Sequence, residues 1–334
     1  MNYQDTAISP YKIIEQPDHP KYPIHVAIDP VNICNHNCPM CFFRKDSEAN
    51  LHIKRDTRGY VLDLEIIKNL FDEIKHHTKA ITLVGGGDPI VHPHIEKIIN
   101  YGNNCGFKIG MVSNGGIKKE IRDCEWIRIS MDAATAKTYE YTHGSKDFNI
   151  TLENIKEYIK NNKFVGVSFL IYPENRHEVY DAAILAKDLG VKYIQYKPVY
   201  TDNCGDEHRP YYTDVADDIK RVKELQTNDF KVLDFWDRVN DLTDRPKEYS
   251  TCGVQDYVTQ IGADGEVYIC CIYKYNVEYS FGNINNESFC EIWNGKMREK
   301  LRKIDVKKCP PCFYNKHNEI IEYKRADKVH KEFI

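Results

Sequence analysis

The chain has 334 residues, a formal net charge of −4 and 29% charged residues. This length predicts about two domains and is sufficient to bury a hydrophobic core. The small net charge, without a long basic run, argues against general binding to nucleic acids or membrane surfaces. No apolar stretch approaches the length of a membrane span, and the N-terminus lacks a secretory signal pattern. We therefore expect a cytoplasmic protein, whose twelve cysteines indicate metal binding or catalysis rather than disulfides.

Short apolar runs alternate with amphipathic stretches along the first 200 residues. The runs predict strands, and the stretches with apolar residues at helical spacing predict helices between them. The predicted strands are 25–29, 80–84, 108–113, 126–132, 164–172 and 193–197, and the clearest predicted helices are 64–75, 94–103, 152–160 and 178–189. Strand–helix units in this order predict a parallel sheet, closed wholly or in part into a barrel. In such a sheet the chemistry gathers at the C-terminal ends of the strands.

Three cysteines, Cys34, Cys38 and Cys41, follow the first predicted strand on one short loop. Three thiolates suit a [4Fe–4S] cluster, because they leave the fourth iron free to bind a substrate or a cofactor. A closed zinc site would need a fourth Cys or His nearby. His36 lies within the loop, but its side chain would have to fold back between the ligands to fill that role.

The spacing of these cysteines, with three and then two residues between them, resembles the signature of the radical S-adenosylmethionine (SAM) superfamily. Met40 stands where many members have an aromatic residue, and its size and polarisability suit that place. After the second predicted strand, the run Gly86-Gly87-Asp88 is similar to the superfamily's Gly-Gly-Glu motif. The resemblance implies that this run binds the amino group of SAM, although a tight turn would also explain the glycines.

Polar residues at the ends of the later strands extend the resemblance. It implies contacts to SAM from Ser113, Asn114, Ser130, Asp132, Ser168 and Lys197. Ser130 and Asp132 would also serve as helix caps, and Lys197 could contact the substrate or face solvent. The residues Tyr139 and His143, which follow the fourth strand, are similar to those of radical SAM enzymes with C-terminal iron–sulfur extensions.

The last third of the chain contains a second set of cysteines. Cys252, Cys270, Cys309 and Cys312 are separated by seventeen, thirty-eight and two residues. A hairpin turn at 263–266 and a helical stretch at 291–301 would bring them together in a small domain that a metal holds in place. Cys271 could replace Cys270, because the register there is uncertain by one residue. Four thiolates suit either structural zinc or an iron–sulfur cluster.

This second set resembles the twitch domain, a shortened form of the SPASM extension. Its spacing is similar to that of the butirosin-pathway amino-cyclitol dehydrogenase. The resemblance implies an auxiliary [4Fe–4S] cluster with no open iron, which suits electron transfer. We therefore predict an α/β fold, with a partial (β/α)6 TIM-like barrel at 22–200, a connecting segment at 201–250, a twitch/SPASM-like domain at 251–316, and a tail or helix at 317–334.

The resemblance also implies the reaction. SAM would be cleaved reductively to a 5′-deoxyadenosyl radical that abstracts a hydrogen atom from the substrate, with an electron from a flavodoxin- or ferredoxin-type donor. The fully ligated second site favours oxidation, and the segment before the first strand is shorter than the recognition domain of many peptide-modifying relatives. The main prediction is a dehydrogenase-like oxidoreductase that acts on a small polar sugar, cyclitol or nucleoside.

Three alternatives remain from the sequence. The first is an epimerase, in which the thiol of Cys204 would return a hydrogen atom to the substrate radical. The second is an enzyme that modifies a ribosomal peptide. The third is a non-enzymatic protein that is stabilised by zinc.

Overall fold

A computed structural model describes residues 10–43, 53–119, 121, 123–161, 164–199, 209–234 and 247–326. One sheet runs through these residues in the strand order β10-β9-β8-β1-β2-β3-β4-β5-β6-β7. The strands predicted from the sequence are β1 (His25–Ile28), β2 (Ala80–Leu83), β3 (Lys108–Ser113), β4 (Trp126–Ser130), β5 (Val165–Ile171) and β6 (Tyr193–Pro198). Successive members of this set pair in parallel. This arrangement confirms the predicted α/β partial barrel.

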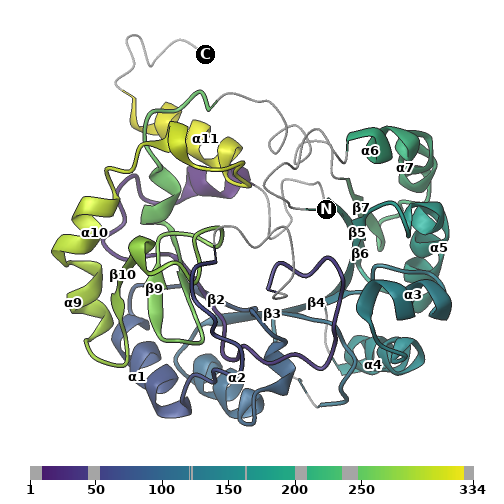
Figure 1. Ribbon diagram of the computed structural model, residues 1–334, viewed down its shortest axis with the longest axis horizontal. Coiled ribbons are helices and arrows are strands. Elements are labelled where there is room, and N and C mark those ends of the chain that lie inside the picture. The colour runs from purple at the N-terminus through teal and green to yellow at the C-terminus, as the bar shows by residue number, and fades with distance from the viewer. Residues whose placement is uncertain are drawn as a thin grey trace.

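Helices cover the outer side of the curved sheet (Figure 1). They include α1 (Leu64–Ile74), α2 (Ile95–Asn104), α3 (Ala136–His143), α4 (Phe148–Asn161), α5 (Val179–Leu189), α6 (Arg209–Asp214) and α7 (Ala216–Glu224). The first of them begins where the side chain of Asp63 accepts a hydrogen bond from the backbone N–H of Glu65, as a helix cap does. It buries an apolar face at helical spacing that includes Ile67, Phe71 and Ile74.

The two faces of the sheet differ in chemistry. Because side chains alternate along a strand, every second residue faces the helices. On β1 and β2 those residues are buried aliphatics: Val26, Ile28, Ile81 and Leu83. The residues between them line an interior cavity and include His25, Ala27, Ala80 and Thr82. A barrel closed around a packed core would place branched aliphatic side chains at those inner positions, so the interior of this sheet is suited to a ligand.

The C-terminal extension is part of the same sheet. It contributes β8 (Val258–Ile261), β9 (Glu266–Tyr268) and β10 (Ser280–Asn283), and β8 pairs in parallel with β1. The core that contains β1 also includes Phe281, Phe289 and Trp293 of the extension. The extension therefore does not depend only on the metal that the sequence predicts, because a strand ladder and apolar packing also attach it to the barrel.

Shorter elements complete the extension. Beyond β10 follow α9 (Phe289–Trp293), α10 (Lys296–Leu301), the 3-10 helix η8 (Val306–Lys308) and α11 (Asn315–Arg325). The N-terminal 3-10 helix η2 (Pro10–Glu15) packs against α11 through Ile13, Ile320 and Ile321. At the other edge of the sheet, β7 (Lys231–Leu233) pairs with β6. Among the described residues, no helix has both the length and the apolar character that crossing a bilayer requires.

Candidate cluster sites and interior cavity

The loop that contains the first three cysteines lies across the ends of β2 and β3. The backbone N–H of Asp88 donates to the carbonyl of Ile33 at 2.9 Å, and the N–H of Asn37 donates to the carbonyl of His143 at 3.1 Å. A Cβ atom at Gly87 would lie 2.1 Å from the Ile33 carbonyl oxygen. Gly144, with φ at +58°, faces the other side of the loop, where a Cβ would lie 2.6 Å from the Asn37 oxygen. These glycines are therefore needed for the backbone to pack against the loop.

The three thiols suit a positively charged iron cluster. Cys34 is exposed, whereas Cys38 and Cys41 are partly buried. Burial raises the pKa of the Cys34 thiol to about 11 and raises that of Cys38 further, and the negative charge of Cys41 adds to both. Three thiolates that repel one another in a partly buried loop need a cation among them. Cys34, Cys38 and Cys41 thus fit a [4Fe–4S] cluster.

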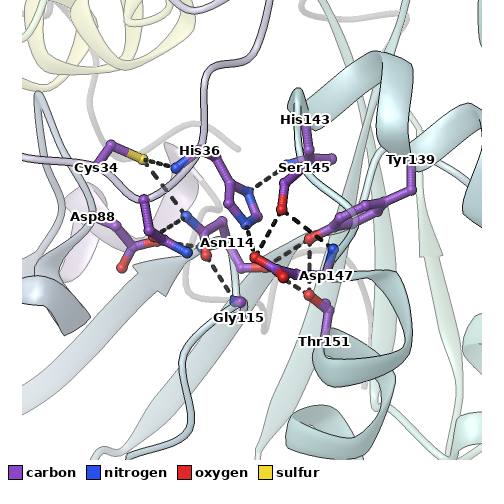
Figure 2. A network of polar contacts seen from close by, with 12 residues as sticks. Cys34, His36, Asp88, Asn114, Gly115, Tyr139, His143, Ser145, Asp147 and Thr151 are labelled. Atoms are coloured by element: carbon purple, nitrogen blue, oxygen red, sulfur yellow. Dashed lines mark hydrogen bonds and ion pairs between the residues drawn. The ribbon is translucent and has the colours of Figure 1, made fainter.

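A histidine pair supports the same loop (Figure 2). Nδ1 of His36 lies 3.3 Å from Nδ1 of His143, and Nε2 of His36 lies 3.3 Å from Oδ2 of Asp147. Nε2 of His143 lies 3.1 Å from the Met131 carbonyl oxygen. Burial lowers the pKa of both histidines to about 4, which favours neutral rings that hold the loop against α3.

The same pair brings a further set of ligand atoms together. His36, Cys38 and His143 place ring nitrogens and a sulfur within 4.8 Å of one another. The ring nitrogens are already engaged with each other, with Asp147 and with the Met131 carbonyl. We therefore assign the histidines to positioning Cys38 rather than to a closed zinc site.

Asp88, Ser113 and Asn114 converge beside the cysteine loop. The Asp88 carboxylate is buried and accepts hydrogen bonds from the hydroxyl of Ser113 at 2.9 Å and from the backbone N–H groups of Asn114 at 2.6 Å and Ile90 at 3.0 Å. The Asn114 amide donates to Oδ1 of Asn35 at 2.9 Å and lies 3.6 Å from Sγ of Cys34. Figure 2 shows Asn114 between Asp88 and the loop. These hydrogen bonds occupy the Asp88 carboxylate. Within the Gly86-Gly87-Asp88 run, the backbone atoms of Gly86 and Gly87 are therefore the groups that we would assign to binding SAM.

The remaining predicted SAM contacts lie at the ends of β4, β5 and β6. Ser130 is paired with Ser168 in the strand register, and Leu170 with Lys197. Asp132 has a φ of +48°, and its Oδ1 accepts from the Leu170 N–H at 2.7 Å. Burial raises the pKa of Asp132 to about 6, while the charge of Lys197 counteracts that rise. The structure therefore gathers these residues at one end of the sheet, as the strand-end rule predicts.

The interior cavity has a volume of about 1750 Å³. Its walls include Phe42 and Phe43 beside the cysteine loop, Arg128 and Lys197 on the sheet, and Cys271 from the extension. The sequence reading missed Arg128, whose Nη1 donates to Oε1 of Gln195 at 2.8 Å. The alternation of side chains along a strand could have identified Arg128 and Gln195. Arg128 stands two positions before Ser130, and Gln195 stands two positions before Lys197.

A buried ion pair joins the segment before the first cysteine loop to the segment after Cys270 and Cys271. Nζ of Lys274 lies 2.5 Å from Oδ2 of Asp29. The same carboxylate accepts hydrogen bonds from the Tyr275 hydroxyl at 2.6 Å and from the Gln260 amide at 2.9 Å. Lys274 also lies over the ring of Phe43, with Nζ 4.5 Å from the ring centre. Asp29 directly follows β1, and Lys274 follows the Cys270-Cys271 pair, so this contact fixes the extension to the segment that leads into the cysteine loop.

Five cysteines converge in the extension. Burial raises the pKa of Cys252 to about 11 and that of Cys312 to about 12, and the negative charge of Cys309 adds to both. Burial also raises the pKa of Cys270, to which the charges of Cys271, Cys312 and Cys252 contribute. Cys270 packs against the main core, whereas Cys271 lines the cavity. Cys270 stays the predicted fourth ligand of an auxiliary cluster, together with Cys252, Cys309 and Cys312. Cys271, whose charge also raises the pKa of Cys312, stays the alternative.

Cys204, the predicted hydrogen-atom donor, lies outside the described residues. Asp202, Asn203 and His208 of the same connecting segment lie outside them as well. Tyr212, which follows in α6, is buried.

Comparisons with known proteins agree with this geometry. Residues 28–186 match the radical SAM superfamily, and residues 252–313 match the SPASM iron–sulfur cluster-binding domain. Among curated proteins, the antilisterial bacteriocin subtilosin biosynthesis protein AlbA of Bacillus subtilis is 24% identical over 288 residues, covering 84% of this chain and 61% of AlbA. The 7,8-dihydro-6-hydroxymethylpterin dimethyltransferase of Methanocaldococcus jannaschii is 25% identical over 322 residues, covering 87% and 61%. The chain thus spans about three fifths of the length of these relatives.

Solved structures share the fold. The crystal structure of Streptococcus suis SuiB bound to precursor peptide SuiA superposes with a TM-score of 0.65 at 11% identity, covering 91% of this chain and 74% of SuiB. The predicted cofactors, SAM and iron–sulfur clusters, follow from the two matched domains. The likeness to the butirosin-pathway enzyme stays a prediction. The chain thus contains a radical SAM domain at residues 28–186 and a C-terminal SPASM domain at residues 252–313.

Proposed function

We propose that the protein uses its radical SAM chemistry to modify a ribosomally made peptide. The observation that supports this most is the cavity of about 1750 Å³, because typical small-molecule sites measure roughly 300–1,000 Å³. A cavity of this size has room for SAM and for several residues of a peptide. The name of AlbA, a bacteriocin biosynthesis protein, and the peptide-bound structure of SuiB agree with this proposal.

The cysteine loop and the inner face of the sheet would have separate roles. Cys34, Cys38 and Cys41 would hold the first cluster, at which SAM supplies hydrogen-atom abstraction and leaves as methionine and 5′-deoxyadenosine. Arg128, held by its hydrogen bond to Gln195, would bind a carbonyl or carboxylate of the substrate. A guanidinium whose orientation is already fixed suits this task, because less side-chain entropy is lost on binding.

Apolar walls would protect the reaction from water. Phe42, Phe43 and Trp126 line the cavity with Lys197 and Gln260. Their rings exclude solvent and competing hydrogen donors, while the two polar side chains orient the substrate. A peptide is thus the first candidate substrate, although the sequence favours a small polar molecule.

A small polar molecule is the second candidate. The interior positions include Thr82, Arg128 and Gln260, which would also bind hydroxyl groups, and the dimethyltransferase relative is named for a pterin substrate. The two candidate substrates, a peptide and a small polar molecule, differ in the size of the molecule that loses a hydrogen atom to SAM.

Deuterium transfer separates the candidates. Cells of the source organism are grown in deuterated medium, and their extract is divided by size into peptides and metabolites. Each fraction is incubated with the reconstituted protein, SAM and dithionite, and 5′-deoxyadenosine is analysed by mass spectrometry. We expect deuterium with the peptide fraction, abolished by exhaustive protease digestion and by Cys38→Ala. Transfer from the protease-resistant metabolite fraction alone would refute the peptide proposal in favour of the second candidate.

A further inference from the structure

The segment directly before Cys309 is strongly basic. Residues 296–308 contain seven lysines and arginines and only two acidic residues, a net charge of +5 in a chain whose total is −4. The seven are Lys296, Arg298, Lys300, Arg302, Lys303, Lys307 and Lys308. Because Glu299 and Asp305 interrupt the segment, it does not form the continuous basic run that marks general nucleic-acid binding.

Most of this charge faces solvent. Six of the seven basic residues, all but Arg298, are exposed on α10, η8 and the turn between them. The ion pairs within the segment are long: Lys303 lies 3.9 Å from Glu299, and Lys308 lies 3.9 Å from Asp305. Such exposed pairs offset little of the field that the basic residues create.

A buried charge cluster supports this surface from behind. The carboxylate of Asp256, which is 4% exposed, lies 3.1 Å from nitrogens of Arg298 and Arg302 and 3.0 Å from a nitrogen of Arg325. One carboxylate among three guanidiniums leaves an excess of positive charge. Asp256 belongs to the 3-10 helix η6 (Gly253–Asp256), which begins directly after Cys252. The basic surface is therefore tied to a ligand of the auxiliary cluster.

The same surface adjoins the turn that contains Cys309 and Cys312. Cys309 and Cys312 are each only partly buried, and Nζ of Lys247 donates to the Cys309 carbonyl at 2.7 Å. A protein bound to the exposed lysines of η8 would thus lie against the loop that holds two of the proposed ligands. Short separations of this kind are what electron transfer between proteins requires.

We propose that this surface, formed by residues 296–308 and Lys247, is the docking site of an acidic one-electron carrier protein. The reduced carrier, a small flavoprotein, loses one electron, and the auxiliary cluster gains it, with no change in bonds or protons. Complementary charge steers such partners together and makes their association depend on salt. This inference rests on the auxiliary cluster and not on the identity of the substrate, so it can fail while the peptide proposal stands.

Charge reversal tests the docking site. Lys300→Glu/Lys307→Glu removes two exposed cations of the surface, and Lys156→Glu/Lys160→Glu on α4 changes the net charge equally. Figure 1 shows α4 and α10 on opposite sides of the molecule. The probe is an acidic flavodoxin, with affinity measured by titration calorimetry at low and high salt. We expect the first variant to bind about tenfold more weakly at low salt, with a flatter salt dependence, and the α4 variant to bind like the unaltered protein.

Reduction kinetics add an independent comparison. Flavodoxin hydroquinone is expected to reduce the first variant about tenfold more slowly, whereas dithionite, which needs no docking, reduces all three proteins alike. Equal flavodoxin affinity in all three proteins, or equal weakening in both variants, would overturn the proposal. So would a variant that binds flavodoxin normally but fails to process the peptide with dithionite, because the surface would then bind an acidic peptide instead.

Discussion

Replacing Lys274 with methionine is expected to lower the free energy of unfolding by about 3–5 kcal/mol. The substitution leaves the Asp29 carboxylate, which is 0% exposed, without its cation. Methionine keeps most of the volume of the lysine side chain, so the loss reports the charge rather than a cavity. Urea-induced unfolding of the unaltered and variant proteins, followed by circular dichroism, measures it.

Two further variants make this result specific. Asp29→Asn/Lys274→Met removes both charges and should recover most of the loss, because a buried pair replaced as a whole costs little. Lys75→Met breaks the ion pair with Asp72, in which both side chains reach solvent, and should change stability little. If Lys274→Met proves as mild as Lys75→Met, the pair does not anchor the extension.

The second large effect concerns the iron content. We expect about eight irons per chain after anaerobic reconstitution and about four in Cys309→Ala/Cys312→Ala, because one of two [4Fe–4S] clusters is lost. Formation of 5′-deoxyadenosine should persist in this variant, since the first cluster depends on Cys34, Cys38 and Cys41. Iron, sulfide and zinc are measured together. About four irons and one zinc in the unaltered protein would contradict the auxiliary cluster and make the extension structural.

Single substitutions decide between the two adjacent cysteines. Cys270→Ser should lose about four irons, as the Cys309→Ala/Cys312→Ala variant does, because Cys270 lies with the other proposed ligands. Cys271→Ser should keep about eight, because Cys271 lines the cavity. The opposite pattern would place Cys271 on the cluster.

The strands of the barrel could be predicted from the sequence because each of them is marked by a pattern of neighbouring residues. Short apolar runs between amphipathic stretches predicted the six strands, and the family resemblance pointed to Asn114 and Asp132 at the ends of two of them. The role of Asp88 was less accessible. Its carboxylate is buried and accepts from Ser113 and Asn114, and a motif match does not show which partners a carboxylate has in the fold.

The pairing of strands that are far apart in the chain could not be predicted from the sequence. The parallel ladder between β1 and β8 joins residues such as Val26 and Thr259, and no periodicity links segments so far apart. The same separation hid the contact between Asp29 and Lys274. Arg128 and Gln195 were missed for a different reason, because only the strand ends were searched although the inner face continues along each strand.

The measurement that tests the central assignment most directly is the formation of 5′-deoxyadenosine from SAM. The reconstituted protein is incubated anaerobically with SAM, with and without dithionite, beside Cys38→Ala and the cavity variant Cys271→Ser. A radical SAM enzyme whose first cluster depends on Cys38 forms 5′-deoxyadenosine only with the reductant, loses it in Cys38→Ala and keeps it in Cys271→Ser. A fully reconstituted protein that forms none, or a Cys38→Ala variant that forms as much as the unaltered chain, would contradict the assignment.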